Sequence, residues 1–161
     1  MEIQIPSLGF TNISITDANL NQSSFNLVEE LKINEFNIRT EFFNQPAKYV
    51  YWSSLLEQAK KQEEAIALEV SRASGSAFEQ ARNALIEEKV LKPTQAQIEA
   101  RLAMNAQVIQ LNQNLNEARS NVRTLQAVVK AFEHRRDMLL QIGAEIRREK
   151  DYERKMNMGN L

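Results

Sequence analysis

Apolar residues recur at alternating spacings of three and four along most of the chain beyond residue 46. The first stripe runs from Tyr49 through Trp52 and Leu56 to Ala77, interrupted by a single glutamate. Asn44-Gln45-Pro46 is typical of a helix start, because asparagine caps well and proline is tolerated in the first turn. The pattern therefore predicts a long helix that begins near residue 44 and buries one face.

Two short segments are expected to interrupt this helical region. Ser74-Gly75-Ser76 weakens the helix and the apolar register shifts after it, which predicts a kink or a short loop. Lys92-Pro93-Thr94 predicts a turn, because proline stops the preceding helix. Thr94 with Gln97 has the spacing of a capping box, so we expect a second helix to begin at this point.

A regular heptad follows from Val108 to Ile146, with one arginine among its apolar positions. This pattern indicates a coiled coil or a helix bundle. The predicted fold is all-α, an extended antiparallel helical hairpin or coiled coil. Long rods leave apolar surface uncovered within one chain, so we expect a homo-oligomer. The positions expected to form its seam are Val122, Leu125, Val129, Phe132, Arg136 and Leu139.

The first 43 residues are less regular and rich in Asn, Ser, Thr and Gln. Apolar residues alternate with polar ones at 2–5 and 12–16, but two such short strands are marginal alone. We interpret residues 1–43 as a flexible or partner-ordered arm, with at best a short helix near Asn26–Leu31. The predicted organisation is this arm, a helical hairpin over 44–155 with its turn near 92–94, and a frayed tail over 156–161.

The sequence offers no combination of residues for catalysis, so we expect a binding surface rather than an enzyme. The single histidine, His134, lies between Glu133 and Arg135 without partners for metal or acid–base chemistry, and indicates an ordinary helix surface. The four glycines lie too far apart for a phosphate-binding loop, and cysteine is absent. We therefore expect no metal and no cofactor. No apolar run approaches the ~20 residues of a membrane span, and no signal peptide is evident, which favours the cytoplasm.

Charge is distributed unevenly although the net charge is only −1. Residues 1–46 hold two bases and six acids, whereas the helical region is mildly basic. Arg136 occupies a seam position, where it either sets the register or binds phosphate. Five further bases are candidates for nucleic-acid binding, although charges mixed with acids on helices are usually plain surface. They are Lys60, Lys61, Arg72, Arg82 and Lys89.

Two stretches resemble a known family. One is Pro46–Lys61, an aromatic Tyr/Trp helix start followed by lysines, and the other is Leu125–Leu139 with its paired arginines, running on to Gly143 and Ile146. Together they resemble the UvsY-like recombination mediators of bacteriophages, over roughly residues 46–150. Lys92-Pro93-Thr94 looks like the hairpin of the shorter, siphophage-type members.

The resemblance implies a helical protein that forms a ring-like homo-oligomer and binds single-stranded DNA. It also implies contact with a single-strand-binding protein and help in loading a RecA-type recombinase. In the family, DNA-contacting bases lie towards the end of the first long helix, a place taken here by Arg72, with Lys60 and Lys61 upstream. The alternative is a structural or assembly protein, such as a phage scaffold or a coiled-coil adaptor, that uses the same heptads for protein contacts alone.

Overall fold

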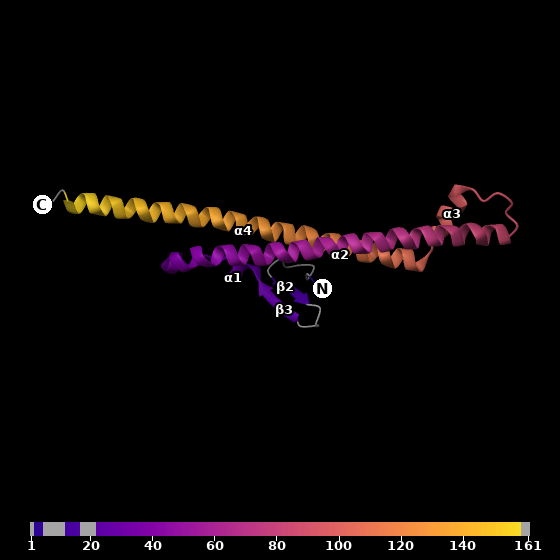
Figure 1. The fold of residues 1–161 in the computed structure, drawn as a ribbon, viewed down its shortest axis with the longest axis horizontal. Coiled ribbons are helices and arrows are strands. Elements are labelled where there is room, and N and C mark those ends of the chain that lie inside the picture. The colour runs from indigo at the N-terminus through magenta and orange to yellow at the C-terminus, as the bar shows by residue number, and fades with distance from the viewer. Residues whose placement is uncertain (1, 5–11, 17–21, 159–161) are drawn as a thin grey trace. The chain divides into compact units, whose positions relative to one another are not determined.

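The fold is dominated by two long helices, as the sequence predicts. A computed structural model describes residues 2–4, 12–16 and 22–158 of the chain. Helix α2 spans Ile38–Glu87 and helix α4 spans Ala106–Met158, with 50 and 53 residues (Figure 1). The chain divides into two compact units, described separately below: unit 1 is residues 1–56 with 124–161, and unit 2 is residues 57–123.

Within unit 1 the N-terminal residues form a small sheet rather than a flexible arm. Strands β1 (Glu2–Gln4), β2 (Asn12–Thr16) and β3 (Gln22–Asn26) are antiparallel in the order β1-β2-β3. The alternating Ile13 and Ile15 of β2 are both buried. The expectation of a flexible or partner-ordered arm did not include this sheet, because a third strand and an apolar face stabilise what two strands could not.

The sheet leads directly into the helices of unit 1. Asn26 ends β3 and caps helix α1 (Leu27–Leu31), accepting hydrogen bonds from the amides of Val28 and Glu29 at 3.0 and 3.3 Å. This confirms the short helix predicted near Asn26. A single 3₁₀ turn, η1 (Glu35–Asn37), then connects α1 to α2.

Helix α2 begins at Ile38, six residues before the predicted start. Pro46 consequently lies inside the helix, where it cannot donate to the carbonyl of Phe42. The extra turns form because their side chains have partners on α4: Phe42 lies against Gly143, and Glu41 forms an ion pair with Arg135. The predicted domain boundary at residues 43–44 therefore lies within the first turns of α2.

The short loop that was one alternative at Ser74-Gly75-Ser76 does not form, because α2 continues through these residues. A glycine costs only about 1 kcal/mol relative to alanine in a helix interior. Ala73 and Ala77 extend the half-buried and buried stripe on either side of Gly75, so the flanking turns hold the helix together.

The predicted turn near 92–94 is confirmed within unit 2, but the second helix is divided. Lys89 adopts φ 66° just after α2, and Thr94 caps helix α3 (Gln95–Leu102) with the predicted capping box to Gln97. The chain turns again after Leu102. There the side chain of Asn105 accepts from the amide of Val108 at 3.1 Å and starts α4.

Helix α4 extends past the predicted start of a frayed tail. Residues 156–158 belong to its last turn, whereas 159–161 lie outside the described residues. Within the described part of the chain, no helix is both long and apolar enough to cross a membrane.

Candidate functional site

The five predicted nucleic-acid-binding residues all lie in unit 2, four of them on α2. At 3.6 residues per turn, Lys60, Lys61, Arg72 and Arg82 fall within about 120° of the helix circumference and span about 33 Å along it. Lys60 is paired with Glu57 at 2.7 Å. Exposed Lys61, Arg72 and Arg82 have no ion pair among the described residues, so we call these three the basic stripe. Lys89, exposed in the turn after α2, stands apart from it.

Acidic side chains share this side of α2. Glu57, Glu64 and Glu79 fall within the same arc of the helix as the basic stripe, and all three are exposed. Unit 2 as a whole holds nine bases and nine acids. The stripe therefore has cations free to meet phosphates, but its local field is weak because neighbouring carboxylates oppose it.

The exposed side of α4 in unit 2 has a different chemistry that sequence reasoning missed. From Ala106 to Arg123 its surface is made largely of asparagine and glutamine, with Glu117 the one acid. Amide side chains both donate and accept hydrogen bonds and carry no charge. The amide-rich composition of this segment is visible in the sequence, but the heptad pattern concerns only its apolar positions and not its exposed ones. Its exposed amides are Gln107, Gln110, Asn112, Gln113, Asn114 and Asn116.

The heptad residues assigned to an oligomer seam are instead used largely within the chain. Val122, Leu125, Val129, Phe132 and Leu139 are all buried without a partner chain. In unit 1 the ring of Phe132 stacks on Trp52, with centroids 6.0 Å apart. A heptad shows that a face is buried but not which chain covers it, so these five are covered within the chain and their role in an oligomer stays a prediction.

Arg136, the sixth seam residue, is exposed and turns to its neighbour. Its guanidinium donates two hydrogen bonds to Asp137, at 2.8 and 3.0 Å. This carboxylate raises the pKa of Arg136 above its ordinary value. The side chain is 60% exposed. It therefore sets no register inside the chain, and its predicted phosphate-binding role stays a prediction.

The adjacent Arg135 is a buried cation in unit 1, and the heptad pattern had assigned it no role. It is 2% exposed and donates to the carbonyls of Leu31 and Lys32, both at 3.1 Å. It also donates to Gln45 Oε1 at 2.5 Å and forms an ion pair with Glu41. Arg135 thereby fixes the end of α1 and the first turns of α2 against α4.

A signal for this buried arginine exists in the spacing. Arg135 follows Phe132 by three residues and precedes Leu139 by four, so all three share one side of α4. The heptad rule assigns position 136 to the seam instead, because it fixes the period at 3.5 residues. A straight helix with 3.6 residues per turn drifts away from that period.

Aromatic rings join the sheet to the helices in unit 1. Phe25 of β3 lies 5.4 Å from Trp52 and 5.6 Å from Tyr51, centroid to centroid. The ring of Tyr51 also lies 5.6 Å from that of Trp52, so the three rings pack against one another. Partial burial, and then the charge of Glu30, raise the pKa of Tyr51 above its ordinary value.

An apolar groove of about 320 Å³ lies between α2 and α4 in unit 1. The hydroxyl of Tyr49 makes a 3.3 Å hydrogen bond with Glu133 at its edge. Arg136 is the second charged residue at this groove. Its apolar lining comes from Phe42, Pro46, Tyr49, Phe132, Leu139 and Leu140.

Residues 2–4, 12–16 and 22–158 bring together no set of side chains suited to metal binding. Within the described part of the chain, no three histidine, aspartate or glutamate side chains are grouped so that they could hold a metal ion. His134 is exposed on α4, as expected of a surface residue. The features that remain are surfaces: the basic stripe, the amide-rich side of α4 and the apolar groove.

Comparison of the chain with protein-family models, with curated proteins and with solved structures finds no match. The resemblance to UvsY-like mediators therefore stays a prediction made from residues 46–150. The surfaces of the two units are therefore the observations that bear on function.

Proposed function

We propose that this chain is a single-stranded-DNA-binding recombination mediator that helps to load a RecA-type recombinase. The observation that carries the proposal is the basic stripe of Lys61, Arg72 and Arg82, whose charges are not used in ion pairs within the described residues. The stripe occupies the part of the first long helix where the family resemblance places DNA contacts. The single-strand-binding protein and a homo-oligomer are the further partners that this proposal includes.

Single-stranded DNA suits the geometry of this surface. A straight row of cations along about 33 Å can follow a phosphate backbone, and repetition in an oligomer multiplies weak contacts along one strand. The nearby amides of α4 in unit 2 offer neutral donors and acceptors of the kind that contact phosphate and sugar oxygens. None of these contacts would select a base sequence, and a mediator does not require sequence selectivity.

A second candidate is an assembly protein with no role in DNA binding. The observation that favours it is the presence of Glu57, Glu64 and Glu79 beside the basic stripe, which leaves unit 2 without net charge. Mixed charges of this kind are typical of a solvated helix surface. In that case the helices serve only protein contacts.

The two candidates differ in one response, because only the mediator should bind DNA with an affinity that depends on the charge of the stripe. We would titrate salt against binding of a fluorescent single-stranded oligonucleotide by the full chain, and compare two charge variants with it. Lys61→Ala/Arg72→Ala/Arg82→Ala should weaken binding, and Glu57→Gln/Glu64→Gln/Glu79→Gln should tighten it. Three lost phosphate contacts reduce the log–log salt slope by about 2 and remove about 20-fold in affinity change between 50 and 200 mM salt.

Lys130→Ala is the control, because this exposed base belongs to unit 1 and is not part of the basic stripe. It should leave the salt slope unchanged. Absence of binding at low salt, or equal binding by the two charge variants, would reject the mediator in favour of the assembly protein.

A further inference from the structure

Basic side chains follow one side of helix α4 in unit 1. At 3.6 residues per turn they fall within about 60° of the helix circumference and span about 27 Å along it. Gly143, which lies against Phe42 of α2, falls within the same arc, so this side of α4 faces α2. The residues, which we call the basic row of α4, are Arg136, Arg147, Lys150 and Arg154.

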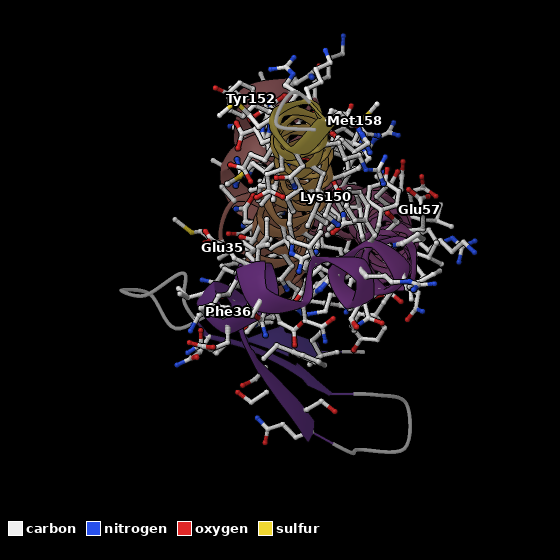
Figure 2. The ribbon with its side chains drawn as sticks, turned by 90° about the vertical axis from the view of Figure 1, so that its left-hand side faces the viewer. Glu35, Phe36, Glu57, Lys150, Tyr152 and Met158 are labelled. Carbon is white, nitrogen blue, oxygen red and sulfur yellow. The ribbon has the colours of Figure 1, made fainter. Side chains whose placement is uncertain are left out.

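The C-terminal part of the basic row lies beyond the start of α2. Because Phe42 lies against Gly143, the first residue of α2, Ile38, is level with about residue 147. In Figure 2, which faces the C-terminal end of α4, Lys150 lies on the side of this helix towards α2 and Tyr152 lies on the opposite side. Residues 147–158 are all exposed.

The basic row carries more uncompensated charge than the basic stripe of unit 2. Its last three members have no ion pair among the described residues. Glu149 and Glu153 lie about 90° or more from the middle of the arc, and only Asp151 lies closer to it. The basic stripe, in contrast, shares its arc with three glutamates. A polyanion therefore meets a stronger positive field at the basic row.

The basic row begins at the apolar groove of unit 1, which Arg136 lines. The groove volume of about 320 Å³ is within the range of about 300–1,000 Å³ that is typical of small-ligand sites. Phe42 and Tyr49 contribute aromatic rings to its walls, and Leu140, which is 55% exposed, lies at its surface. A flat ring can therefore pack against these walls.

The acids near the groove already have partners. Glu133 is hydrogen-bonded to the hydroxyl of Tyr49, and Asp137 accepts two hydrogen bonds from Arg136. The charge that remains free along the groove and the basic row is positive. An apolar ring attached to an anionic chain matches this combination.

We propose that an unpaired base of single-stranded DNA enters the apolar groove, and that the phosphates next to it lie along the basic row of α4. This inference rests on the proposed function and adds a second DNA contact, in unit 1. Aromatic walls stack on bases of any sequence, and exposed cations neutralise phosphates. A base inside a duplex is stacked and paired and cannot enter the groove, so this contact favours single strands.

The regular charge of a DNA strand favours it over a partner helix as the occupant. Every nucleotide carries a phosphate, so a strand anchored in the groove brings an anion to each base of the row. A partner helix would need a large apolar side chain for the groove and a carboxylate opposite each of three successive bases.

Salt dependence gives the first test, with a fluorescent thymidine oligonucleotide and the full chain. Arg147→Ala/Lys150→Ala/Arg154→Ala should weaken binding and reduce the log–log salt slope by about 2, because three phosphate contacts are lost. Arg148→Ala/Lys155→Ala is the control, because these exposed bases lie more than about 100° from the middle of the arc. It should leave the slope unchanged.

An abasic oligonucleotide of the same length gives the second test, because it keeps the phosphates and lacks the bases. The unaltered chain should bind the thymidine oligonucleotide roughly tenfold more tightly than the abasic one. Leu140→Gln should reduce this preference. Met138→Gln is the matched control, because Met138 is also 55% exposed on α4 but does not line the groove. Circular dichroism of both variants shows that the helices are intact.

Photo-cross-linking gives the third test, with an iodouracil-labelled oligonucleotide and mass spectrometry of the adduct. The cross-link should form at half-buried Tyr49, whereas non-specific contact would favour the more exposed rings of Phe36 and Tyr152. Cross-links at those exposed rings alone, or equal affinity for the thymidine and abasic oligonucleotides, would overturn the inference.

The outcomes separate this inference from the proposed function. Absence of DNA binding by the unaltered chain at low salt would reject both. If DNA binds and the basic-stripe variant weakens it, but the basic-row variant and Leu140→Gln bind as the unaltered chain does, the inference alone is overturned. The groove would then be left to a partner protein.

Discussion

The two units of this chain are built from the same two helices but have different interiors. The five largest fully buried side chains, Trp52, Phe132, Ile13, Leu125 and Leu139, all belong to unit 1. Unit 1 also holds a buried arginine and a small sheet. The interior of unit 2 is made of smaller side chains, namely Ala59, Ala77, Ala81, Leu85, Ile98, Val108, Leu115, Ala118 and Val122.

Because of this difference, we expect the two units to differ in local stability. Buried apolar area stabilises at roughly 25 cal/mol per Å², so large rings contribute more per residue than alanines do. Alanine also has the highest helix propensity, which lets unit 2 remain helical with little tertiary support. We therefore expect unit 1 to hold the fold and unit 2 to open locally at a lower free energy.

The largest loss of stability is expected from removing the aromatic ring at the centre of unit 1. We expect Phe132→Ala to lower the free energy of unfolding by about 3–5 kcal/mol, because it deletes the partner of Trp52 and leaves a cavity. Leu85→Ala, in the core of unit 2 with Ala81 and Ile98, should cost about 2–3 kcal/mol. Urea denaturation followed by tryptophan fluorescence and by circular dichroism measures both.

Hydrogen exchange would show in which unit each substitution lowers the stability. Leu85→Ala should speed exchange in unit 2 alone, whereas Phe132→Ala should speed it throughout the chain. If Phe132→Ala affected unit 1 only and left unit 2 protected, the view of unit 1 as the element that holds the fold would be wrong.

Arg135 and its neighbour Arg136 form a matched pair for the next test. Arg135→Met should destabilise by about 3 kcal/mol, because Glu41 and Gln45 then lie largely buried without their donor. Arg136→Met should change stability by less than about 0.5 kcal/mol, because its side chain is 60% exposed. Thermal unfolding of the two variants gives the comparison, and equal losses would contradict the role assigned to Arg135.

The sequence predicted the helical fold because its strongest signals are local. Period and capping chemistry involve neighbours in the chain, so Asn26 and the Thr94–Gln97 box could be identified without a structure. The start of α2 could not, because Glu41 in its first turn is held by Arg135, a partner 94 residues away. The same limit applies to the third strand, whose Phe25 depends on Trp52.

For the candidate site, the sequence located charges but not their partners. It named Arg72 as a candidate DNA contact on the first long helix, and the exposure of Arg72 there follows from helical period alone. It did not distinguish Arg135 from Arg136, because a shift of one residue decides which side chain enters the core. Nor could it show that the heptad around Val129 is covered within one chain, since a period is the same for intrachain and interchain packing.

The two helical glycines, one in each unit, should respond to substitution by alanine in opposite ways. A Cβ at Gly143 would lie 3.0 Å from Cζ of Phe42, so Gly143→Ala must displace that ring. We expect it to destabilise by about 1 kcal/mol, the overpacking exceeding the gain in helix propensity. A Cβ at Gly75 meets nothing within 4 Å, and Gly75→Ala should stabilise by about 0.5–1 kcal/mol. Thermal melts of the two variants should shift in opposite directions, and a common direction would contradict this account.

The smallest expected effect concerns the exposed ion pair between Glu88 and Arg101 in unit 2. The hydrogen bond from Arg101 lowers the pKa of Glu88 below its ordinary value, and the arginine charge acts in the same direction. Since the folded pKa is lowered, the pair contributes stability above the ordinary carboxyl pKa of about 4.3, and that contribution is lost as pH falls through the lowered value. Carbon-detected NMR titration of Glu88 measures this pKa, which should return to its ordinary value in Arg101→Gln.

The same Arg101→Gln variant shows whether the pair holds α3 to the end of α2. Amide exchange in Gln95–Leu102 should then become faster above pH 5, where Glu88 is charged in both proteins, and the difference should shrink at a pH low enough to protonate Glu88. Exchange in unit 1 should not change at either pH, because neither residue belongs to it. A change that reached the Trp52 core would mean that the units unfold together, and the division of stability between them would have to be abandoned.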